Sequence, residues 1–398
     1  MKRIIGLLLL SAASGLVAPA AVAGLVGEAP APPSLEARID RAAAELLAKK
    51  ETAGFAIGIA EKGQIRLVKG YGFADIEDRV AVTDRTVFRI GSVTKEFMAA
   101  GILLLAEQGK LSLDDPLSKY LPDFPRGGEI TLRNLLNHTS GIHNYTSIDG
   151  FMKNEGTRAL SSDEMVRYIT TGKPLYDFEP GTGWNYSNSG FLLLGVVAEK
   201  VSGQPLDQYL KASIFGPLGL NDTRLDNLAE IVPDRASGYD KAPTLPIGFT
   251  NAGHIAMEVA AGAGAIRSTA PDLLKWHAAL LGGKLLKPES LALMTALGKL
   301  KDGRLASAAR PVRPGAASSD YGFGIMIGEQ KGRRTIGHGG SIHGFNSSLN
   351  TYPDQQMTIV VLTNTMGGAG AVVNAMTDAI FGLPPAQPAA PAPAVKPQ

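Results

Sequence analysis

A serine and a lysine three positions apart are the first candidates for chemistry in this sequence. Ser92 and Lys95 form the only Ser-x-x-Lys in the 398-residue chain. On a helix, residues three apart share one face, so the lysine amine can reach the serine hydroxyl. A serine attacks carbonyl carbons only when a base takes its proton, and a desolvated lysine with a lowered pKa can be that base. Alone, the tetrapeptide is more often an exposed pair on a surface helix.

A second local pattern is Tyr186-Ser187-Asn188, the only Tyr-x-Asn in the chain. A phenol can shuttle a proton when nearby positive charge lowers its pKa. A carboxamide can hold a substrate amide because it both donates and accepts hydrogen bonds. Taken separately, a tyrosine and an asparagine in a loop are usually turn formers and surface hydrogen-bonding groups.

The third pattern is the tetrapeptide His338-Gly339-Gly340-Ser341, placed before a strand expected from about residue 345. Small residues let a substrate backbone approach closely, and a free backbone N–H beside them can donate into an oxyanion hole. An ordinary glycine turn is the simpler alternative.

The elements around these patterns decide whether they can meet. Residues 97–106 are almost entirely apolar, which predicts a buried helix that begins at Ser92 and directs its positive dipole end toward the serine. Ser34 is a typical N-cap for an amphipathic helix, and residues 55–60 and 64–69 form a predicted hairpin. Residues 111–264 are predicted to be helical and rich in loops.

Within residues 111–264, helices are expected at 161–170, 191–201 and 206–214. The C-terminal third changes character, with helices expected at 271–281 and 371–381 and strands at 321–327, 345–351 and 357–363. Pro353 and Asp354 predict a turn, and therefore antiparallel pairing, between the last two strands. The glycines near residues 262–264 are interpreted as a tight loop.

The resulting fold class is α/β (α+β), with one antiparallel sheet built from both chain ends, flanked by helices, and an inserted, mostly helical subdomain. The domain is expected over residues 34–383, with a sheet subdomain from 34–91 and 265–383 and a helical subdomain from 92–264. Contiguous separate domains are the alternative. The Pro/Ala segment 384–398 is expected to be a disordered tail.

Composition excludes several functions. The chain has no cysteine, which removes disulfides, thiolate zinc sites and cysteine nucleophiles. There is no His-Glu-x-x-His and no Gly-x-Ser-x-Gly elbow, so neither a metal site nor an α/β-hydrolase is expected, and no cofactor is implied. Lys2 and Arg3 belong to a predicted signal peptide, and without them 37 of the 39 basic residues remain, against 37 acidic residues. This balance gives no reason to expect nucleic acid as a binding partner. A small molecule or short peptide is the expected substrate.

The N-terminus predicts export. Lys2 and Arg3 precede an apolar run at 4–10 and an A-x-A cleavage pattern ending at Ala23, so residues 1–23 are predicted to be a signal peptide. The mature protein would then be periplasmic or secreted. An uncleaved membrane anchor is the alternative, since residues 4–27 carry no charge, although Pro19 and the abundance of Ala and Gly favour cleavage.

The three patterns in this order resemble the serine β-lactamase and penicillin-recognising enzyme superfamily. The branch that is most similar holds class C β-lactamases, D-alanyl-D-alanine carboxypeptidases, D-aminopeptidases and β-lactamase-like esterases. The resemblance extends over roughly residues 35–381. Further segments similar to sequences of this family lie at residues 88–92, 109–116, 135–141, 217–220 and 321–324.

This resemblance implies roles for the catalytic candidates. Ser92 would be the nucleophile that forms an acyl-enzyme. Lys95 would be its base, or the positive charge that keeps Tyr186 poised. Tyr186 would pass the proton to the leaving group, with activation of the deacylating water as a further role, and Asn188 would bind the acyl side of the substrate.

The same resemblance places His338, Gly339 and Gly340 at the family's Lys-Thr-Gly position on an edge strand, with the backbone N–H groups of Ser92 and Ser341 as the oxyanion hole. Here the sequence departs from class C β-lactamases, because a histidine is neutral at pH 7 and Gly339 has no side chain. The departure favours peptidases and esterases over β-lactam hydrolysis.

The function expected is therefore an exported serine hydrolase acting on a small amide, ester or D-amino-acid peptide, of the D-Ala-D-Ala carboxypeptidase or esterase type. A class C-like β-lactamase is the alternative within enzymes. A non-catalytic member of the fold that binds peptidoglycan or a protein partner is the alternative of another class. The sequence leaves the natural substrate and the oligomeric state open.

Overall fold

The computed structural model describes residues 1, 33–306 and 319–384. The expected signal peptide and residues 385–398 of the expected tail lie outside the described residues. None of the helices in the described part of the chain is long and apolar enough to cross a bilayer.

An eight-stranded sheet joins the two ends of the domain, in the order β3-β2-β1-β13-β12-β11-β10-β9. Every neighbouring pair in it is antiparallel. The strands are β1 (Gly54–Glu61), β2 (Gln64–Asp75), β3 (Val80–Ala81), β9 (Ser319–Tyr321), β10 (Met326–Gln330), β11 (Arg333–Ile342), β12 (Phe345–Tyr352) and β13 (Met357–Thr363). Because β1 pairs with β13, the predicted sheet built from both chain ends is confirmed.

Helices cover both faces of this sheet, as the alternation along β1 requires. Phe55, Ile57 and Ile59 pack with α1 (Leu35–Ala48) and α10 (Ala369–Phe381) in one apolar cluster. Gly58 faces the other side, where a Cβ would lie 3.0 Å from Leu274 of α8 (Ala270–Leu280). The predicted cap of α1 is present, since Ser34 Oγ accepts a hydrogen bond from the N–H of Ala37.

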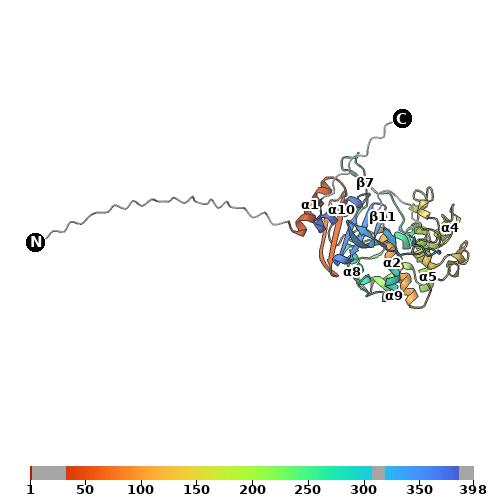
Figure 1. Ribbon diagram of the computed structural model, residues 1–398. Helices are drawn as coiled ribbons and strands as arrows, with labels where there is room; N and C mark the ends of the chain where they lie inside the picture. Colours follow the sequence, from red (N-terminus) through yellow and green to blue (C-terminus); the bar gives the residue numbers. More distant parts are fainter. Residues whose placement is uncertain (2–32, 307–318, 385–398) are drawn as a thin grey trace, which may run out of the picture.

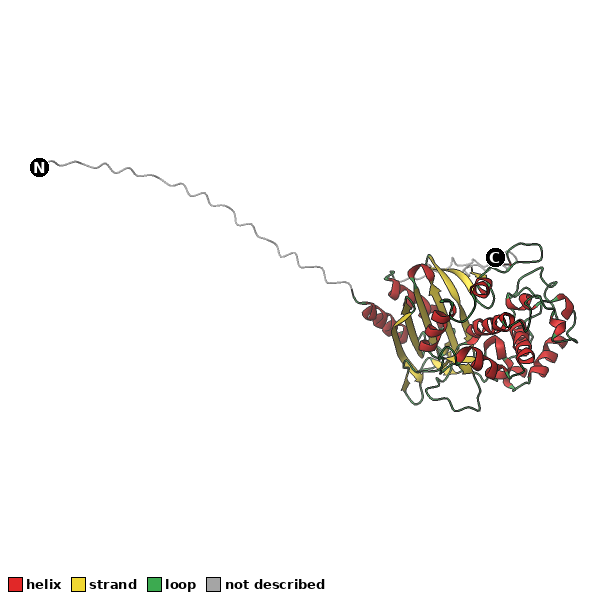
Figure 2. Ribbon diagram, turned by 90° about the horizontal axis from the view of Figure 1, so that it is seen from below, coloured by secondary structure: helices red, strands yellow, loops and turns green. Residues whose placement is uncertain are grey.

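The inserted region is mostly helical and lies on the side of the molecule away from α1 and α10 (Figures 1 and 2). Its helices are α2 (Thr94–Glu107), α3 (Leu132–Leu136), α4 (Ser162–Thr171), α5 (Asn188–Ser202), α6 (Leu206–Leu210) and α7 (Ala261–Gly264). Helix α9 (Pro288–Met294) follows later in the sequence. Helix α2 contacts α5, α7 and α9, which explains why nearly all of its residues are apolar and buried.

Two small sheets complete the fold. One has the order β4-β8-β5, and the other has the order β14-β6-β7. Their strands are β4 (Phe88–Arg89), β5 (Arg224–Leu225), β6 (Tyr239–Lys241), β7 (Phe249–Asn251), β8 (Ile266–Ser268) and β14 (Thr365–Met366). The first of them leads directly into the Ser92 turn.

Several local predictions were wrong. The expected strand 321–327 is two strands, β9 and β10, because the chain bends between them at Gly324, which has a φ of +67°. The glycines expected to form a tight loop at 262–264 instead belong to the short helix α7. The expected helix 206–214 is α6 followed by one π-helical turn, Lys211–Phe215. The alternative of an ordinary glycine turn at His338–Ser341 was also wrong, because these residues lie inside β11, as the edge-strand position implied by the resemblance requires.

Candidate active site

Ser92 lies in a short 3₁₀ turn, η1 (Gly91–Val93), between β4 and α2, rather than on the helix itself. The turn is held from both sides. The Ile90 N–H donates to the carbonyl of Ile266 at 3.0 Å, and the Ile266 N–H donates to Thr94 Oγ1 at 3.1 Å. On the opposite side, Ser347 Oγ donates to the Ile90 carbonyl at 2.7 Å. Strands β8 and β12 therefore fix the position of the serine.

Strand β11 lies directly against this turn. A Cβ on Gly340 would come within 2.0 Å of the Ile90 oxygen, and a Cβ on Gly91 would come within 2.8 Å of the Ser341 nitrogen. Real Cβ atoms do not make such contacts, so only glycine allows the two backbones to approach this closely. The predicted third pattern and the Ser-x-x-Lys are thus brought together.

The amine of Lys95 is buried and makes three polar contacts. Its Nζ lies 3.1 Å from Ser92 Oγ, 2.8 Å from Asn188 Oδ1 and 2.7 Å from the Ala263 carbonyl oxygen. The Lys95 side chain has no exposed surface and no carboxylate hydrogen-bonded to it among the described residues. Burial lowers the pKa of Lys95 well below its usual value. A neutral amine can act as a base toward the serine.

Tyr186 lies over the lysine, with Lys95 Nζ 4.8 Å from the centre of its ring. The Tyr186 hydroxyl is buried and hydrogen-bonded to no group in the described part of the chain. Burial raises the pKa of Tyr186 above its usual value, and the nearby Ser92 side chain opposes this only in part. The phenol is therefore protonated at neutral pH and close to the serine.

Asn188 begins α5 and has both ends of its amide engaged by the protein. Its Oδ1 accepts from Lys95 Nζ, and its Nδ2 donates to Thr146 Oγ1 at 3.2 Å. The backbone N–H of Asn188 donates to Asn144 Oδ1 at 3.1 Å. In this structure the amide positions the lysine, while the predicted contact of Asn188 with the acyl group stays a prediction.

His338 is buried and uncharged. Its Nδ1 lies 2.5 Å from the Gly339 carbonyl oxygen and must carry the hydrogen, so its Nε2 accepts from the Tyr321 hydroxyl at 2.9 Å. Burial, together with the nearby Lys95, lowers the pKa of His338 to about 3. His338 therefore supplies no positive charge at neutral pH.

The outer edge of β11 is open beside the serine. Strand β10 pairs only with residues 333–337, so the edge from His338 to Ile342 has no partner strand in the described structure. The two-residue hairpin loop makes Ile342 and Phe345 a hydrogen-bonded pair, and the alternation along the strand then directs the Ser341 N–H to the open edge. An extended substrate backbone can pair with such an edge.

A cavity of about 190 Å³ opens at Ser92. Asn188 and Ser341 also line it, whereas His338, Gly339 and Gly340 do not. Its walls are mainly apolar, and no Lys, Arg, Asp or Glu of the described part of the chain belongs to its lining. Of the predicted site residues, Ser92, Asn188 and Ser341 face this cavity, and Lys95 reaches it through Ser92.

A family model described as Beta-lactamase matches residues 39–382. The chain belongs to the beta-lactamase family. The resemblance inferred from the three sequence patterns is thereby confirmed, and so is the fold class.

Among the relatives of this beta-lactamase family protein is penicillin-binding protein 4* of Bacillus subtilis (strain 168), 31% identical over 87% of this chain and 77% of that protein. A D-aminopeptidase of Gluconobacter oxydans (strain 621H) is 27% identical over 88% of this chain. The alignment covers 63% of that D-aminopeptidase, less than two thirds of its length. The structure of the D-amino acid amidase from Ochrobactrum anthropi SV3 with L-phenylalanine amide has a TM-score of 0.76 and 26% identity, covering 87% and 99% of the two chains.

Sequence reasoning missed three contributors to this beta-lactamase family site. The Ala263 carbonyl bonds Lys95 but is a backbone atom, so no residue type marks it. Thr146 holds the Asn188 amide, and His343 lines the cavity from the hairpin loop between β11 and β12. Burial is the main cause that lowers the pKa of His343, so this side chain is neutral at pH 7.

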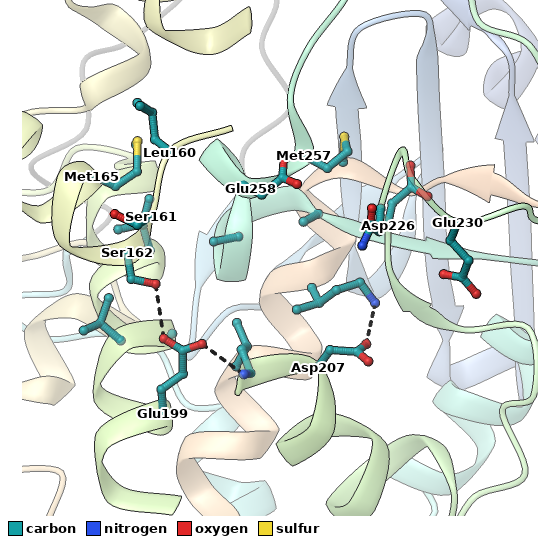
Figure 3. Close-up of a pocket in the computed structure, with 18 residues that line it drawn as sticks. Leu160, Ser161, Ser162, Met165, Glu199, Asp207, Asp226, Glu230, Met257 and Glu258 are labelled. Carbon is teal, nitrogen blue, oxygen red and sulfur yellow. Dashed lines mark hydrogen bonds between the residues drawn. The ribbon is translucent and has the colours of Figure 1, made fainter. Parts of the chain in front are cut away.

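A larger cavity of about 370 Å³ lies beside α5 and α7 and lacks both Ser92 and Lys95 (Figure 3). At one end of this cavity, the Glu199 carboxylate accepts hydrogen bonds from Ser162 Oγ at 3.2 Å and from the Leu206 N–H at 3.0 Å. Within residues 33–306 and 319–384, no group of three or more His, Asp or Glu side chains could hold a metal ion.

Proposed function

We propose that this protein is an exported serine hydrolase that forms an acyl-enzyme at Ser92 on a small amide, ester or D-amino-acid peptide. The observation that carries the proposal is the contact of the buried Lys95 Nζ with Ser92 Oγ at 3.1 Å. The names of the relatives support hydrolysis of D-amino-acid compounds, and the geometry supports the serine as nucleophile.

The lowered pKa of Lys95 favours a neutral amine, and its three contacts can accommodate one. Such an amine has two N–H donors and one lone pair. Asn188 Oδ1 and the Ala263 carbonyl accept the two hydrogens, which leaves the lone pair for the Ser92 hydroxyl. Proton transfer from Ser92 to Lys95 then accompanies attack of Oγ on the substrate carbonyl carbon.

The remaining steps use Tyr186 and two backbone groups. As the bond to the leaving group breaks, the Tyr186 hydroxyl donates its proton to that group and recovers one from Lys95. The N–H groups of Ser92 and Ser341 stabilise the oxyanion, an effect worth roughly 3 kcal/mol per donor in comparable sites. Water then attacks the ester carbon, and its proton passes through the same side chains as Ser92 leaves.

The cavity favours an uncharged acyl group. Its lining has no charged side chain, and both nearby histidines, His338 and His343, are neutral at pH 7. A β-lactam carries a carboxylate that the lysine of Lys-Thr-Gly faces in class C enzymes, and His338 does not provide that charge. Esters and amides with a small apolar acyl group therefore suit the 190 Å³ cavity better than β-lactams.

A kinetic panel tests this proposal. The substrates are p-nitrophenyl acetate, D-phenylalanine amide, a D-Ala-D-Ala peptide and a cephalosporin, each with wild-type enzyme and Ser92→Ala. We expect the ester or an amide to exceed the cephalosporin in kcat/KM by about tenfold or more, and Ser92→Ala to lose about a thousandfold or more of kcat. Fastest turnover of the cephalosporin would support the β-lactamase alternative. A folded wild-type protein that turns over none of the four and is acylated by none would support the non-catalytic alternative.

Export is tested separately, by mass spectrometry of the mature protein. A chain that starts near Gly24 is the expected result. An intact N-terminus on protein outside the cytoplasm would favour the anchor.

A further inference from the structure

A third cavity, of about 230 Å³, lies beside the Ser92 turn and has a strongly basic lining. Arg89 enters it from β4, three residues before Ser92, and Arg267 enters it from β8. Arg235 completes the set. Among the residues that the structure describes, Asp226 is the only acidic one that lines this cavity.

The charges around this cavity do not cancel. Asp226 is buried and accepts hydrogen bonds from Arg89 Nε at 2.8 Å and from Arg235 Nη2 at 2.7 Å, while Arg267 Nη1 lies 3.6 Å away. Glu230 pairs with Arg267 Nη2 at 3.0 Å, but its side chain is 52% exposed. Three guanidinium groups therefore face two carboxylates, of which only one is buried, and an excess positive charge stays next to the cavity. Burying a charge without a partner is costly.

Two donors of these arginines have no acceptor. The Nε atoms of Arg235 and Arg267 are buried and hydrogen-bonded to nothing in the described structure. The Arg267 side chain is only 7% exposed, so water reaches little of it. A guanidinium presents its Nε–H and one Nη–H as a fork that fits two oxygens of one carboxylate or phosphate.

Asp226 borders a second cavity as well. Asp226 lies between this cavity and the 370 Å³ cavity, and it lines both. Figure 3 shows Asp226 and Glu230 together at one end of the larger cavity. The remaining lining of the basic cavity is uncharged, and Arg89 is stacked over Phe345, 5.7 Å from the ring centre.

We propose that this cavity binds a small oxyanion, either a carboxylate or a phosphate group, through the guanidinium groups of Arg235 and Arg267. The anion would supply the negative charge that the cluster lacks and accept from the guanidinium N–H groups that border the cavity. This site is separate from the Ser92 cavity, whose lining contains no arginine, and it does not depend on the proposed hydrolase activity.

Thermal unfolding of the full-length protein tests the site. Sodium phosphate, sodium acetate and sodium chloride are compared at equal ionic strength and pH, with calorimetric titration of phosphate and acetate. We expect a saturable rise in Tm with phosphate or acetate that exceeds the effect of chloride. A rise with phosphate alone identifies a tetrahedral anion, and a rise with acetate identifies a carboxylate.

Matched arginine variants locate the binding. Arg235→Gln is expected to weaken binding of the effective anion about tenfold or more, and Arg235→Lys to give a smaller loss, because it keeps the charge without the fork. Arg85→Gln is the control, since Arg85 is 76% exposed and lies outside the cavity lining. Equal stabilisation by all three salts, or equal losses in Arg235→Gln and Arg85→Gln, would overturn the proposal.

Discussion

Replacing Gly340 with alanine is expected to separate β11 from the turn that holds Ser92. The new Cβ would lie 2.0 Å from the Ile90 oxygen and 2.5 Å from Ser347 Oγ. Since Cβ contacts under 3.0 Å essentially never occur, the strand and the turn must move apart by about 1 Å. The Ser341 N–H, on the next residue of β11, moves with the strand.

The size of the effect follows from that displacement. A shift of about 1 Å in a positioned catalytic group costs roughly a hundredfold in rate, which corresponds to about 2.7 kcal/mol of activation free energy. The same clash is expected to cost about 1–3 kcal/mol of folding free energy. Gly340→Ala is thus expected to lower kcat much more than it raises KM.

The assay compares Gly340→Ala with Gly339→Ala on a chromogenic ester, with denaturant unfolding to establish that each variant is folded. A Cβ on Gly339 would meet only the Ser347 carbonyl oxygen, at an ordinary 3.6 Å. Gly339→Ala is therefore expected to lose about twofold in kcat or less. If folded Gly340→Ala kept kcat within about threefold of wild type, the close approach of β11 would not set the rate, and this reasoning would be refuted.

Three further predictions concern the groups around the serine. Lys95 acts as a base only when neutral, so kcat/KM is expected to fall as the pH is lowered through its depressed pKa. A profile that stays flat down to pH 4 would contradict this. Asn188→Asp places a carboxylate beside Lys95 Nζ and is expected to move that acid limb upward by about one pH unit or more; an unmoved limb would rule out the contact as a control of the Lys95 pKa. The pKa of Lys95 is lower in the folded than in the unfolded protein, so at a pH between the two values only the unfolded protein carries a proton on Lys95. The free energy of unfolding of wild type is therefore expected to rise relative to that of Lys95→Met as the pH rises toward 10. Parallel denaturant titrations at several pH values test the sign.

Much of the fold could be predicted because its signals are local. Ser34 marks the start of α1 through its side-chain cap, and the turn between β12 and β13 follows from Pro353 and Asp354. The apolar run after Lys95 indicated a buried helix, and α2 is buried on nearly every side. In each case neighbouring residues alone determine the structure.

The missed features depend on contacts that are distant in sequence. Strand β11 contains Gly337, Gly339 and Gly340, and glycine is rare in strands, so the local pattern alone left a turn open and only the resemblance placed residues 338–340 on an edge strand. Glycine is needed at position 340 because the Ile90 carbonyl occupies the space that a side chain would take. The contact of Lys95 with the Ala263 carbonyl likewise exists only because α7 packs against α2. No sequence pattern marks a backbone acceptor supplied by another element.

The most direct test of the account is to identify the residue that becomes acylated. The protein is mixed with a chromogenic ester or a fluorophosphonate, quenched in acid, digested and mapped by mass spectrometry. The account predicts an adduct on Ser92, lost in Ser92→Ala and formed much more slowly in Lys95→Met. An adduct on another residue, or unchanged labelling of Ser92→Ala, would contradict it.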